Sequence, residues 1–203
     1  MENLRPFCIV LVKSAHGGFD GGAVAYDGTV EKEINLNIAL KLQQMLQFYG
    51  AEVIMTRTAD TGTDSHGDET IARRKKSDLQ NRLALMEQYP DAVYVSIHLN
   101  KFTTGAARGA QVFYTPNFEE AALLGQNIQD SFVERLQPEN DRTIKKGTKS
   151  TYLLKNATVP AVIVECGFLS NRGELQQLKT NEYQSKVSFV ILAGILNFFE
   201  TPT

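Results

Sequence analysis

Short apolar runs alternate with longer amphipathic stretches along this chain. The short runs are rich in β-branched and aromatic residues, and they predict buried strands at 7–12, 52–56, 92–98, 109–115, 151–155 and 161–168. The longer stretches place apolar residues at helical spacing, and they predict helices at 31–49, 70–88, 119–136 and 182–199. Strands that alternate with helices indicate an α/β protein, here a layered sandwich in which helices flank a mostly parallel or mixed central sheet.

The segments between these elements are polar. Residues 14–29 are rich in glycine, residues 60–69 combine Gly, Ser, Thr and Asp, and residues 138–150 are polar and basic, so all three are predicted to be loops. The chain contains no repeat, low-complexity tract or clear linker. Its 203 residues suit one domain, and we expect residues 1–203 to form a single catalytic domain.

Composition narrows the classes of partner. The net charge of −2 does not favour a nucleic acid or an anionic membrane as the ligand. No run of about 18 apolar residues predicts a transmembrane helix, and the start of the chain does not resemble a secretion signal. Cys8 and Cys166 both lie within apolar runs, so we expect two buried free thiols and no disulfide.

Four polar residues stand at the edges of predicted elements. His16 follows the first strand, His98 ends the third, Glu165 lies late in the last strand, and Glu31 begins a helix. Ligands of α/β sheets bind where the carboxyl ends of strands meet loops. Two histidines and one glutamate could bind zinc with an open position for water, and the second glutamate would then serve as a base.

Each of these residues also has an ordinary structural interpretation. A histidine at a strand end is often only a hydrogen-bonded residue at the rim of a sheet, and an acid at a helix start is favoured by the helix dipole. Other catalytic motifs are absent from the sequence, since no Gly-x-Ser-x-Gly elbow occurs and no Gly-Lys-Ser/Thr follows the glycine-rich segment. Spacing alone therefore leaves the metal site as one interpretation among several.

Ordered sequence blocks carry a resemblance to a known family. The blocks HGGFDGGA, VEKEINLNIALKL, VIMTRTAD, VSIHLN and PAVIVECGFLSN occur in this order over nearly the whole chain. With them the chain resembles the zinc-dependent N-acetylmuramoyl-L-alanine amidases, the type-3 amidase family. The resemblance implies that His16, Glu31 and His98 bind one Zn²⁺ per chain and that Glu165 is the catalytic base. It also implies hydrolysis of the amide bond between N-acetylmuramic acid and L-alanine in peptidoglycan.

Three further blocks narrow the resemblance. ETIARRKKSDLQNRL, RGAQVFYTPNFEE and YLLKNATVPAVIVECGFLSN are similar to the germination-specific amidases of spore-forming bacteria. Those enzymes remove stem peptides from spore-cortex peptidoglycan so that muramic δ-lactam can form. The implied location is extracytoplasmic, in the cell wall or forespore envelope, and we expect the export segment to be absent from this chain.

The chain departs from the family pattern beside the first histidine. Lys13 stands where the family usually has an acid, and Ala15 stands where it has glycine. Lys13 puts in question any acid that would orient His16 or a neighbouring ligand. The stretch between His98 and Glu165 is short, so we expect no inserted blocking helix, and targeting would come from a missing N-terminal segment or from a partner.

Substrate contacts are expected from fewer signals. Asn100, just past His98, is a candidate donor to substrate, although it is also a plausible turn residue. Arg73, Arg74 and Arg82 lie on one predicted helix; Arg73 or Arg82 is a candidate for the acidic stem peptide, and a solvated helix face is the alternative. His66 lies in the polar loop and is not expected at the metal.

Two rival functions remain open at this stage. One is a zinc peptidase that cuts within the stem peptide. The other is a metal-poor peptidoglycan-binding protein that depends on a protein activator or a membrane-anchored partner.

Overall fold

The computed structural model describes residues 8–65, 70–148 and 151–200. One six-stranded sheet runs through these ranges in the order β2-β1-β3-β6-β4-β5. β1, β2, β3 and β6 pair in parallel, whereas β4 pairs antiparallel to β6 and parallel to β5. The expected α/β sandwich with a mixed, mostly parallel sheet is confirmed.

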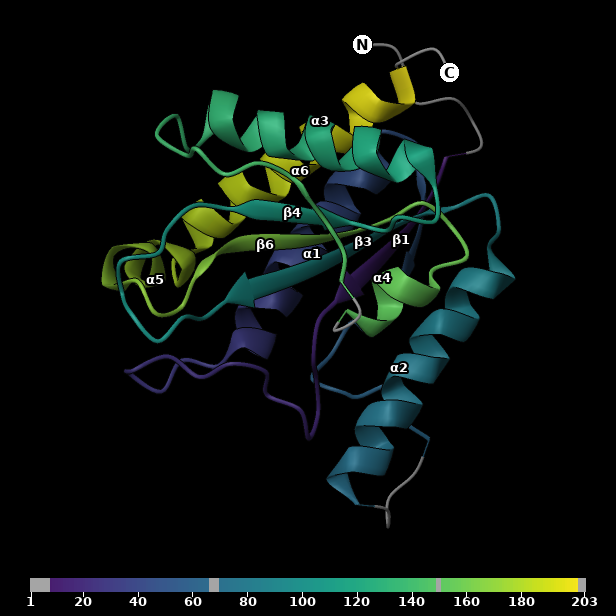
Figure 1. Ribbon diagram of the computed structural model, residues 1–203, viewed down its shortest axis with the longest axis horizontal. Helices are drawn as coiled ribbons and strands as arrows, with labels where there is room; N and C mark the ends of the chain where they lie inside the picture. The colour runs from purple at the N-terminus through teal and green to yellow at the C-terminus, as the bar shows by residue number, and fades with distance from the viewer. Residues whose placement is uncertain (1–7, 66–69, 149–150, 201–203) are drawn as a thin grey trace.

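The elements follow the predicted alternation closely (Figure 1). The strands are β1 (Ile9–Ser14), β2 (Glu52–Met55), β3 (Val93–Asn100), β4 (Gln111–Tyr114), β5 (Lys145–Lys146) and β6 (Ala161–Phe168). The helices are α1 (Glu31–Phe48), α2 (Ile71–Gln88), α3 (Glu119–Arg135), α4 (Tyr152–Asn156), α5 (Arg172–Leu178) and α6 (Asn181–Glu200).

The two faces of the sheet are covered unequally. α1, α3 and α6 pack together over one face and enclose the larger apolar core, which includes Val12, Val95 and Val164. α2 and α4 cover part of the other face, where Leu11 and Tyr94 belong to a smaller core. On the face of the smaller core, the side on which α2 and α4 lie in Figure 1, the carboxyl ends of β1 and β3 border a cavity lined by Lys13 and His98 among others.

The local structure departs from the predictions at three places. Residues 151–155 do not form a strand, because Leu153 and Leu154 are both buried and the Lys155 amide donates to the Thr151 carbonyl, as in a helical turn. Helix α5 was missed, although its sequence carries a start signal: the Asn171 side chain accepts from the Glu174 amide. β5 also lies within the stretch that was predicted to be loop.

The expectation of two buried free thiols is confirmed. Cys8 and Cys166 are buried and free. None of the helices in the described residues is long and apolar enough to cross a membrane.

Candidate metal centre

The strands bring polar side chains to the accessible end of the sheet. Side chains two residues apart on a strand share a face, so Lys13 lies beyond Leu11 on β1, and His98 lies beyond Tyr94 on β3. His98 and Glu165 are register partners across β3 and β6. On the same face, a row of polar side chains therefore follows the smaller core toward the carboxyl ends of the strands, and residues of α2 border it.

His16 reaches this row from the loop after β1. Its backbone takes a positive φ of 60°, which is uncommon outside glycine and turns the chain sharply. A Cβ at Gly22 would lie 2.6 Å from both the His16 ring and the Glu31 carboxylate, so only glycine lets this loop fold against the cluster.

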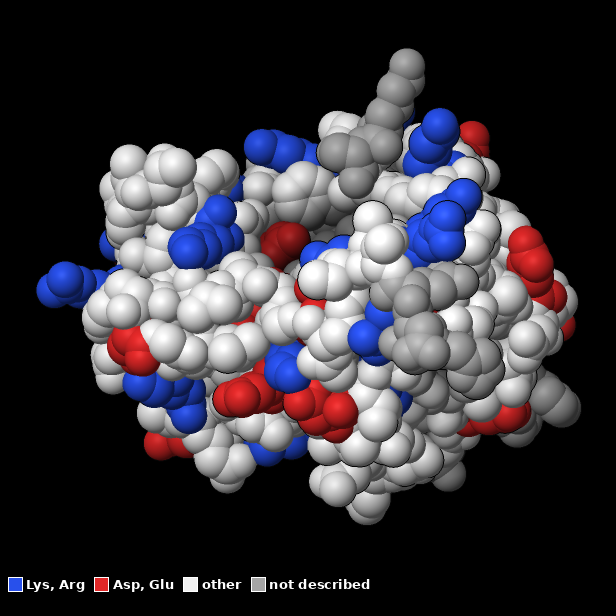
Figure 2. Space-filling model, turned by 90° about the horizontal axis from the view of Figure 1, so that it is seen from below, with Lys and Arg blue, Asp and Glu red and all other residues white. Residues whose placement is uncertain are grey.

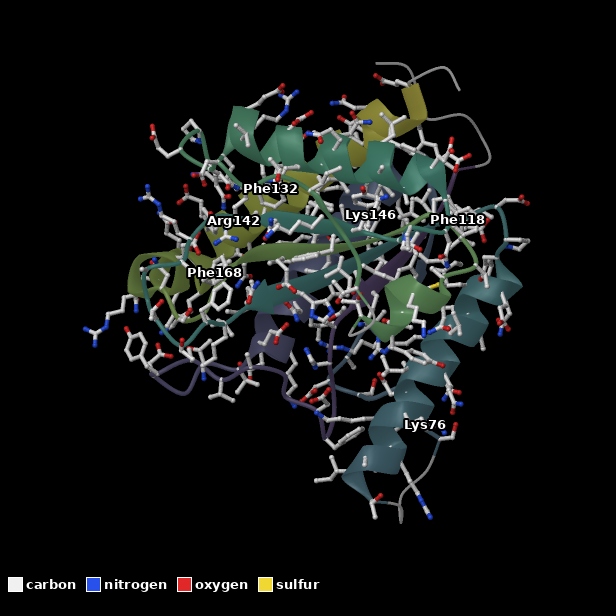
Figure 3. The ribbon with its side chains drawn as sticks, viewed as in Figure 1. Lys76, Phe118, Phe132, Arg142, Lys146 and Phe168 are labelled. Carbon is white, nitrogen blue, oxygen red and sulfur yellow. The ribbon has the colours of Figure 1, made fainter. Side chains whose placement is uncertain are left out.

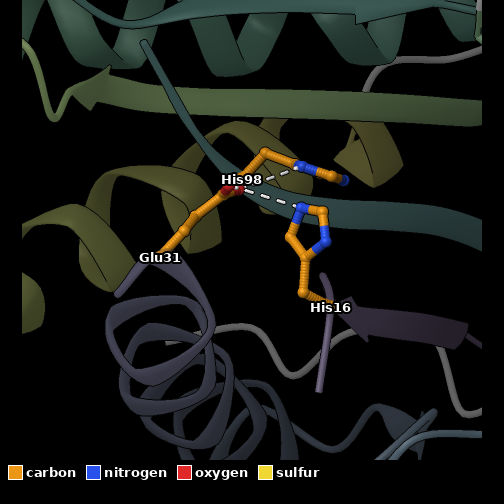
Figure 4. Close-up of side chains that lie close together, drawn as sticks. All are labelled: His16, Glu31 and His98. Atoms are coloured by element: carbon orange, nitrogen blue, oxygen red, sulfur yellow. Dashed lines mark ion pairs between the residues drawn. The ribbon is translucent and has the colours of Figure 1, made fainter. Parts of the chain in front are cut away.

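Glu31, the first residue of α1, joins the two histidines (Figure 4). Its Oε2 lies 3.3 Å from His16 Nε2, and its Oε1 lies 3.3 Å from His98 Nδ1. One ligand atom from each of these three residues lies within 4.8 Å of the others. Two imidazoles and one carboxylate at this spacing fit a zinc ion with one position left for water.

The Glu31 carboxylate is fixed by more than the histidines. It is 3% exposed, and it accepts hydrogen bonds from the Ala23 amide at 2.9 Å, the Leu99 amide at 3.0 Å and the Asn35 side chain at 3.1 Å. Burial raises its pKa, but the hydrogen bonds from His16 and His98 outweigh burial and hold the pKa well below the usual range. Glu31 is therefore a charged carboxylate held in one orientation.

The two histidines differ in their electrostatic setting. Burial opposes the charge on His16, yet the Asp20 and Glu31 carboxylates raise its pKa to about 9. Burial and the nearby Lys13 cation lower the pKa of His98 to about 4. Without a metal, a proton on His16 balances the Glu31 charge, and a bound cation would replace that proton.

Asp20 was not predicted as a site residue. Its Oδ2 accepts from His16 Nδ1 at 2.7 Å, which leaves His16 Nε2 directed at Glu31, and Lys75 on α2 contacts its other oxygen at 3.0 Å. An acid on the outer nitrogen fixes the tautomer that a metal ligand needs. The available signal was Asp20 itself, four residues after His16 in the same glycine-rich segment.

Lys13 lies beside the other histidine. The ammonium nitrogen is 3.3 Å from His98 Nε2, and the side chain is buried. Burial and the Arg82 charge lower the pKa of Lys13 to about 7. The departure from the family pattern thus affects the surroundings of His98, while His16 keeps an orienting acid in Asp20.

Glu165 stands next to the cluster without being one of its three members. Its Oε2 is buried and has no hydrogen-bond partner among the described residues. Burial and the charge of Glu31 raise its pKa to about 8, and a bound cation would lower it again. A buried carboxylate with a vacant oxygen is suited to receive a proton from a molecule that enters the site.

The candidate substrate residues are placed differently from one another. Arg82 is 1% exposed and binds Asp78, the Ser14 and His16 carbonyls and the Thr56 hydroxyl. It therefore does not lie on a solvated helix face, and its guanidinium is not free to bind substrate. Arg73 is exposed near the start of α2, and Arg74 pairs with Asp64. Asn100 ends β3 and its Oδ1 accepts from the Lys101 amide. His66 lies outside the described residues.

A cavity of about 200 Å³ lies between α2 and the cluster. Its walls combine both histidines with residues of α2 and of the His16 loop: Lys13, His16, Phe19, Asp20, Lys75, Asp78, Leu79 and His98. The surface on this side of the molecule is hollowed near its centre, with acidic atoms inside the hollow and basic residues around it (Figure 2). A ligand can therefore approach the cluster from this side.

An α/β sheet that carries a His-Glu-His cluster beside an unpaired, buried glutamate has the parts of a metal-dependent hydrolase. The chain belongs to the N-acetylmuramoyl-L-alanine amidase family, whose model matches residues 10–197. It is an amidase that acts on cell-wall peptidoglycan, as members of this family do.

Individual relatives agree with this assignment. The chain is 38% identical to the germination-specific N-acetylmuramoyl-L-alanine amidase of Bacillus subtilis, over 94% of this chain and 79% of the relative. The CwlD amidase of Clostridioides difficile, solved in complex with the GerS lipoprotein, superposes with a TM-score of 0.90 at 34% identity, covering 94% of this chain and 98% of that one. An N-acetylmuramoyl-L-alanine amidase from Clostridium difficile 630 gives a TM-score of 0.82 at 27% identity, covering 98% and 100%.

Replacement of Arg82 by alanine should destabilise the protein by about 3–5 kcal/mol, because it removes a buried ion pair with Asp78 together with the hydrogen bonds to the Ser14 and His16 carbonyls and the Thr56 hydroxyl. The free energy of unfolding, from urea denaturation, measures the loss. Arg73→Ala, on the exposed face of the same helix, is the control and should change it by less than about 0.5 kcal/mol. A similarly small change for Arg82→Ala would show that Arg82 does not support the His16 loop.

Proposed function

We propose that this amidase depends on one zinc ion, held by His16 Nε2, the Glu31 carboxylate and His98 Nδ1. Support comes from the 3.3 Å contacts of both nitrogens with Glu31 and from the Asp20 acid behind His16. The observation that carries the proposal is the buried, unpaired Oε2 of Glu165 beside this cluster, because a structural site would not leave that oxygen without a partner.

Glu165 acts as the base. When bound, zinc lowers the pKa of a water molecule and polarises the amide carbonyl of the substrate. Glu165 accepts the proton of the attacking water and then delivers it to the nitrogen of the leaving L-alanine. Asp20 keeps the His16 imidazole oriented through this cycle, since its hydrogen bond involves Nδ1 and not the nitrogen that would hold the metal.

Two further residues are proposed to contact the stem peptide of the substrate. The Asn100 amide group lies two residues beyond His98 and can donate to the stem peptide, and Arg73 offers an exposed cation to its acidic residues. Arg82 is left out, because its donors are engaged inside the protein. We take residues 1–203 to act as one catalytic domain.

The cellular role that we propose is removal of stem peptides from spore-cortex peptidoglycan, which prepares muramic acid for δ-lactam formation. The support is the similarity to the germination-specific amidase of Bacillus subtilis. The enzyme would then work outside the cytoplasm. The complex of the Clostridioides difficile relative with a lipoprotein supports a membrane-anchored protein partner.

An activator-dependent enzyme is the second candidate. Lys13 favours it, because an ammonium next to His98 Nε2 faces the nitrogen that would carry a hydrogen once Nδ1 binds metal. Such a site would bind zinc weakly in the isolated protein, and it would bind zinc more tightly with a partner that moves Lys13 away from His98.

Substitutions of the base and of a ligand should separate their roles. Glu165→Gln should lose at least about a hundredfold in turnover and keep its zinc, because a neutral amide cannot accept the proton. His98→Ala should lose both activity and zinc, because it removes one of three protein ligands. Zinc content and peptide release are measured on the same preparations. Equal zinc loss in a folded Glu165→Gln protein would make Glu165 a ligand, and full zinc in His98→Ala would exclude His98.

The cortex assignment has its own test in the organism that encodes the chain. Deletion of the gene should remove muramic δ-lactam from spore muropeptides, and a copy with Glu165→Gln should not restore it. Chromatography of digested cortex gives the measurement. Unchanged δ-lactam in the deletion strain would contradict a cortex role and would leave the amidase class unaffected.

A further inference from the structure

Phe102 is a large apolar side chain that is exposed and yet held in place. Its ring is 52% exposed just beyond the carboxyl end of β3. One side is supported by Phe168, with ring centroids 5.5 Å apart and planes 14° from parallel. The Phe102 amide also donates to the Ser170 hydroxyl at 3.1 Å. Phe102 is therefore a fixed aromatic surface with part of its area open to solvent.

A second exposed ring lies on the neighbouring loop. Tyr26 is 59% exposed, and the Arg172 guanidinium lies 5.0 Å from its ring centroid. The Lys101 ammonium, next to Phe102, donates to the Val24 carbonyl at 2.7 Å and ties the two loops together. Single exposed apolar residues need no explanation, but two supported rings on linked loops form a small patch, here called the aromatic patch and made of Tyr26 and Phe102.

A series of contacts connects the aromatic patch to the face of the sheet that carries Glu165. Gln111 on β4 is the register partner of Glu165, so both side chains lie on the same face of the sheet. Arg142 donates to Gln111 Oε1 at 3.1 Å, and its guanidinium lies 4.7 Å from the Phe168 ring that supports Phe102. Figure 3 shows Arg142 and Phe168 next to each other near the carboxyl end of β6.

Phe102 of the aromatic patch is also close in sequence to His98, one of the proposed metal ligands. Phe102 follows His98 by four residues, so their Cα atoms are at most about 14 Å apart. A polymeric substrate that is cut at the cluster must continue past it on both sides. A sugar next to the muramic acid that loses its peptide can therefore reach Phe102.

The chemistry of the patch fits a sugar ring better than the stem peptide. Pyranose rings present faces of C–H groups that pack on aromatic rings, with hydroxyl and amide groups left at the edge for polar neighbours. The neighbouring cations are already engaged, Lys101 with a carbonyl and Arg172 with the Tyr26 ring, so the patch offers little to an acidic peptide. Within a glycan strand the muramic carboxyl is consumed by the peptide bond, which leaves an uncharged chain of sugars to recognise.

We propose that Tyr26 and Phe102 form a glycan subsite that binds the sugars next to the muramic acid whose peptide is removed. The subsite makes the enzyme favour polymeric glycan over isolated muramoyl peptides. It rests on the amidase function and does not depend on the zinc or spore-cortex assignments.

The test compares two substrates with one matched control. The ratio of kcat/KM for polymeric peptidoglycan to kcat/KM for a muramoyl-peptide monomer should fall about three- to tenfold in Phe102→Ala. Phe102→Trp should keep most of the ratio, since it preserves an aromatic face. Phe48→Ala is the control, because Phe48 is 78% exposed at the far end of α1, about 25 Å from Glu31, and it should leave the ratio unchanged.

Each result has a defined meaning. An unchanged ratio for Phe102→Ala, or an equal loss on both substrates, would overturn the proposal. A loss that appears only when a protein activator is added would show that the patch docks a protein instead. Co-sedimentation with chitin, an insoluble and uncharged polymer of N-acetylglucosamine, tests the subsite without catalysis: wild type and Phe48→Ala should bind more than Phe102→Ala and Tyr26→Ala. If wild type binds glycan but cleaves neither substrate, the subsite stands, and the missing activity points to an absent activator or an empty metal site.

Discussion

The buried carboxylate of Glu31 is the interaction on which the site depends. It contacts a histidine from the loop after β1 and a histidine from β3, and it accepts amide hydrogens from Ala23 and Leu99. Three segments that are distant in sequence are thereby held around one charge. Such a charge is costly to bury unless it is paired, so the fold is most stable when these partners, or a metal that replaces a proton between them, stay in place.

The different cover of the two faces of the sheet explains where a ligand can approach the cluster. α1, α3 and α6 complete the larger core, whereas on the opposite face a cavity remains between α2 and the residues Lys13 and His98. His98 and Glu165 lie there as register partners on adjacent strands. α2 still takes part, because Arg82 binds the carbonyls of Ser14 and His16 and Lys75 contacts Asp20. The helix that borders the cavity thus also supports the loop that carries the first histidine.

Much of this arrangement could be predicted from the sequence. The alternation of short β-branched runs and amphipathic stretches indicated the mixed sheet and its helical layers, and the ordered blocks around His16, Glu31, His98 and Glu165 indicated the family. A five-residue segment with only three apolar residues, Tyr152 to Leu154, does not distinguish a strand from a helical turn, so α4 was misassigned. The hydrophobic pattern also could not predict contacts between distant residues. Arg82 donates to the carbonyl of Ser14, 68 positions away, and Lys13 contacts His98, 85 positions away.

The central claim is that a metal held by His16, Glu31 and His98 serves the cleavage of the muramic acid–L-alanine bond. The most direct measurement counts zinc per chain and identifies the N-terminal residue of peptides released from purified peptidoglycan, before chelation, after chelation and after zinc is restored. The account predicts one zinc per chain and peptides that begin with L-alanine, lost on chelation and recovered with zinc. Release that survives complete removal of the metal, or peptides that begin at a later residue of the stem, would contradict it.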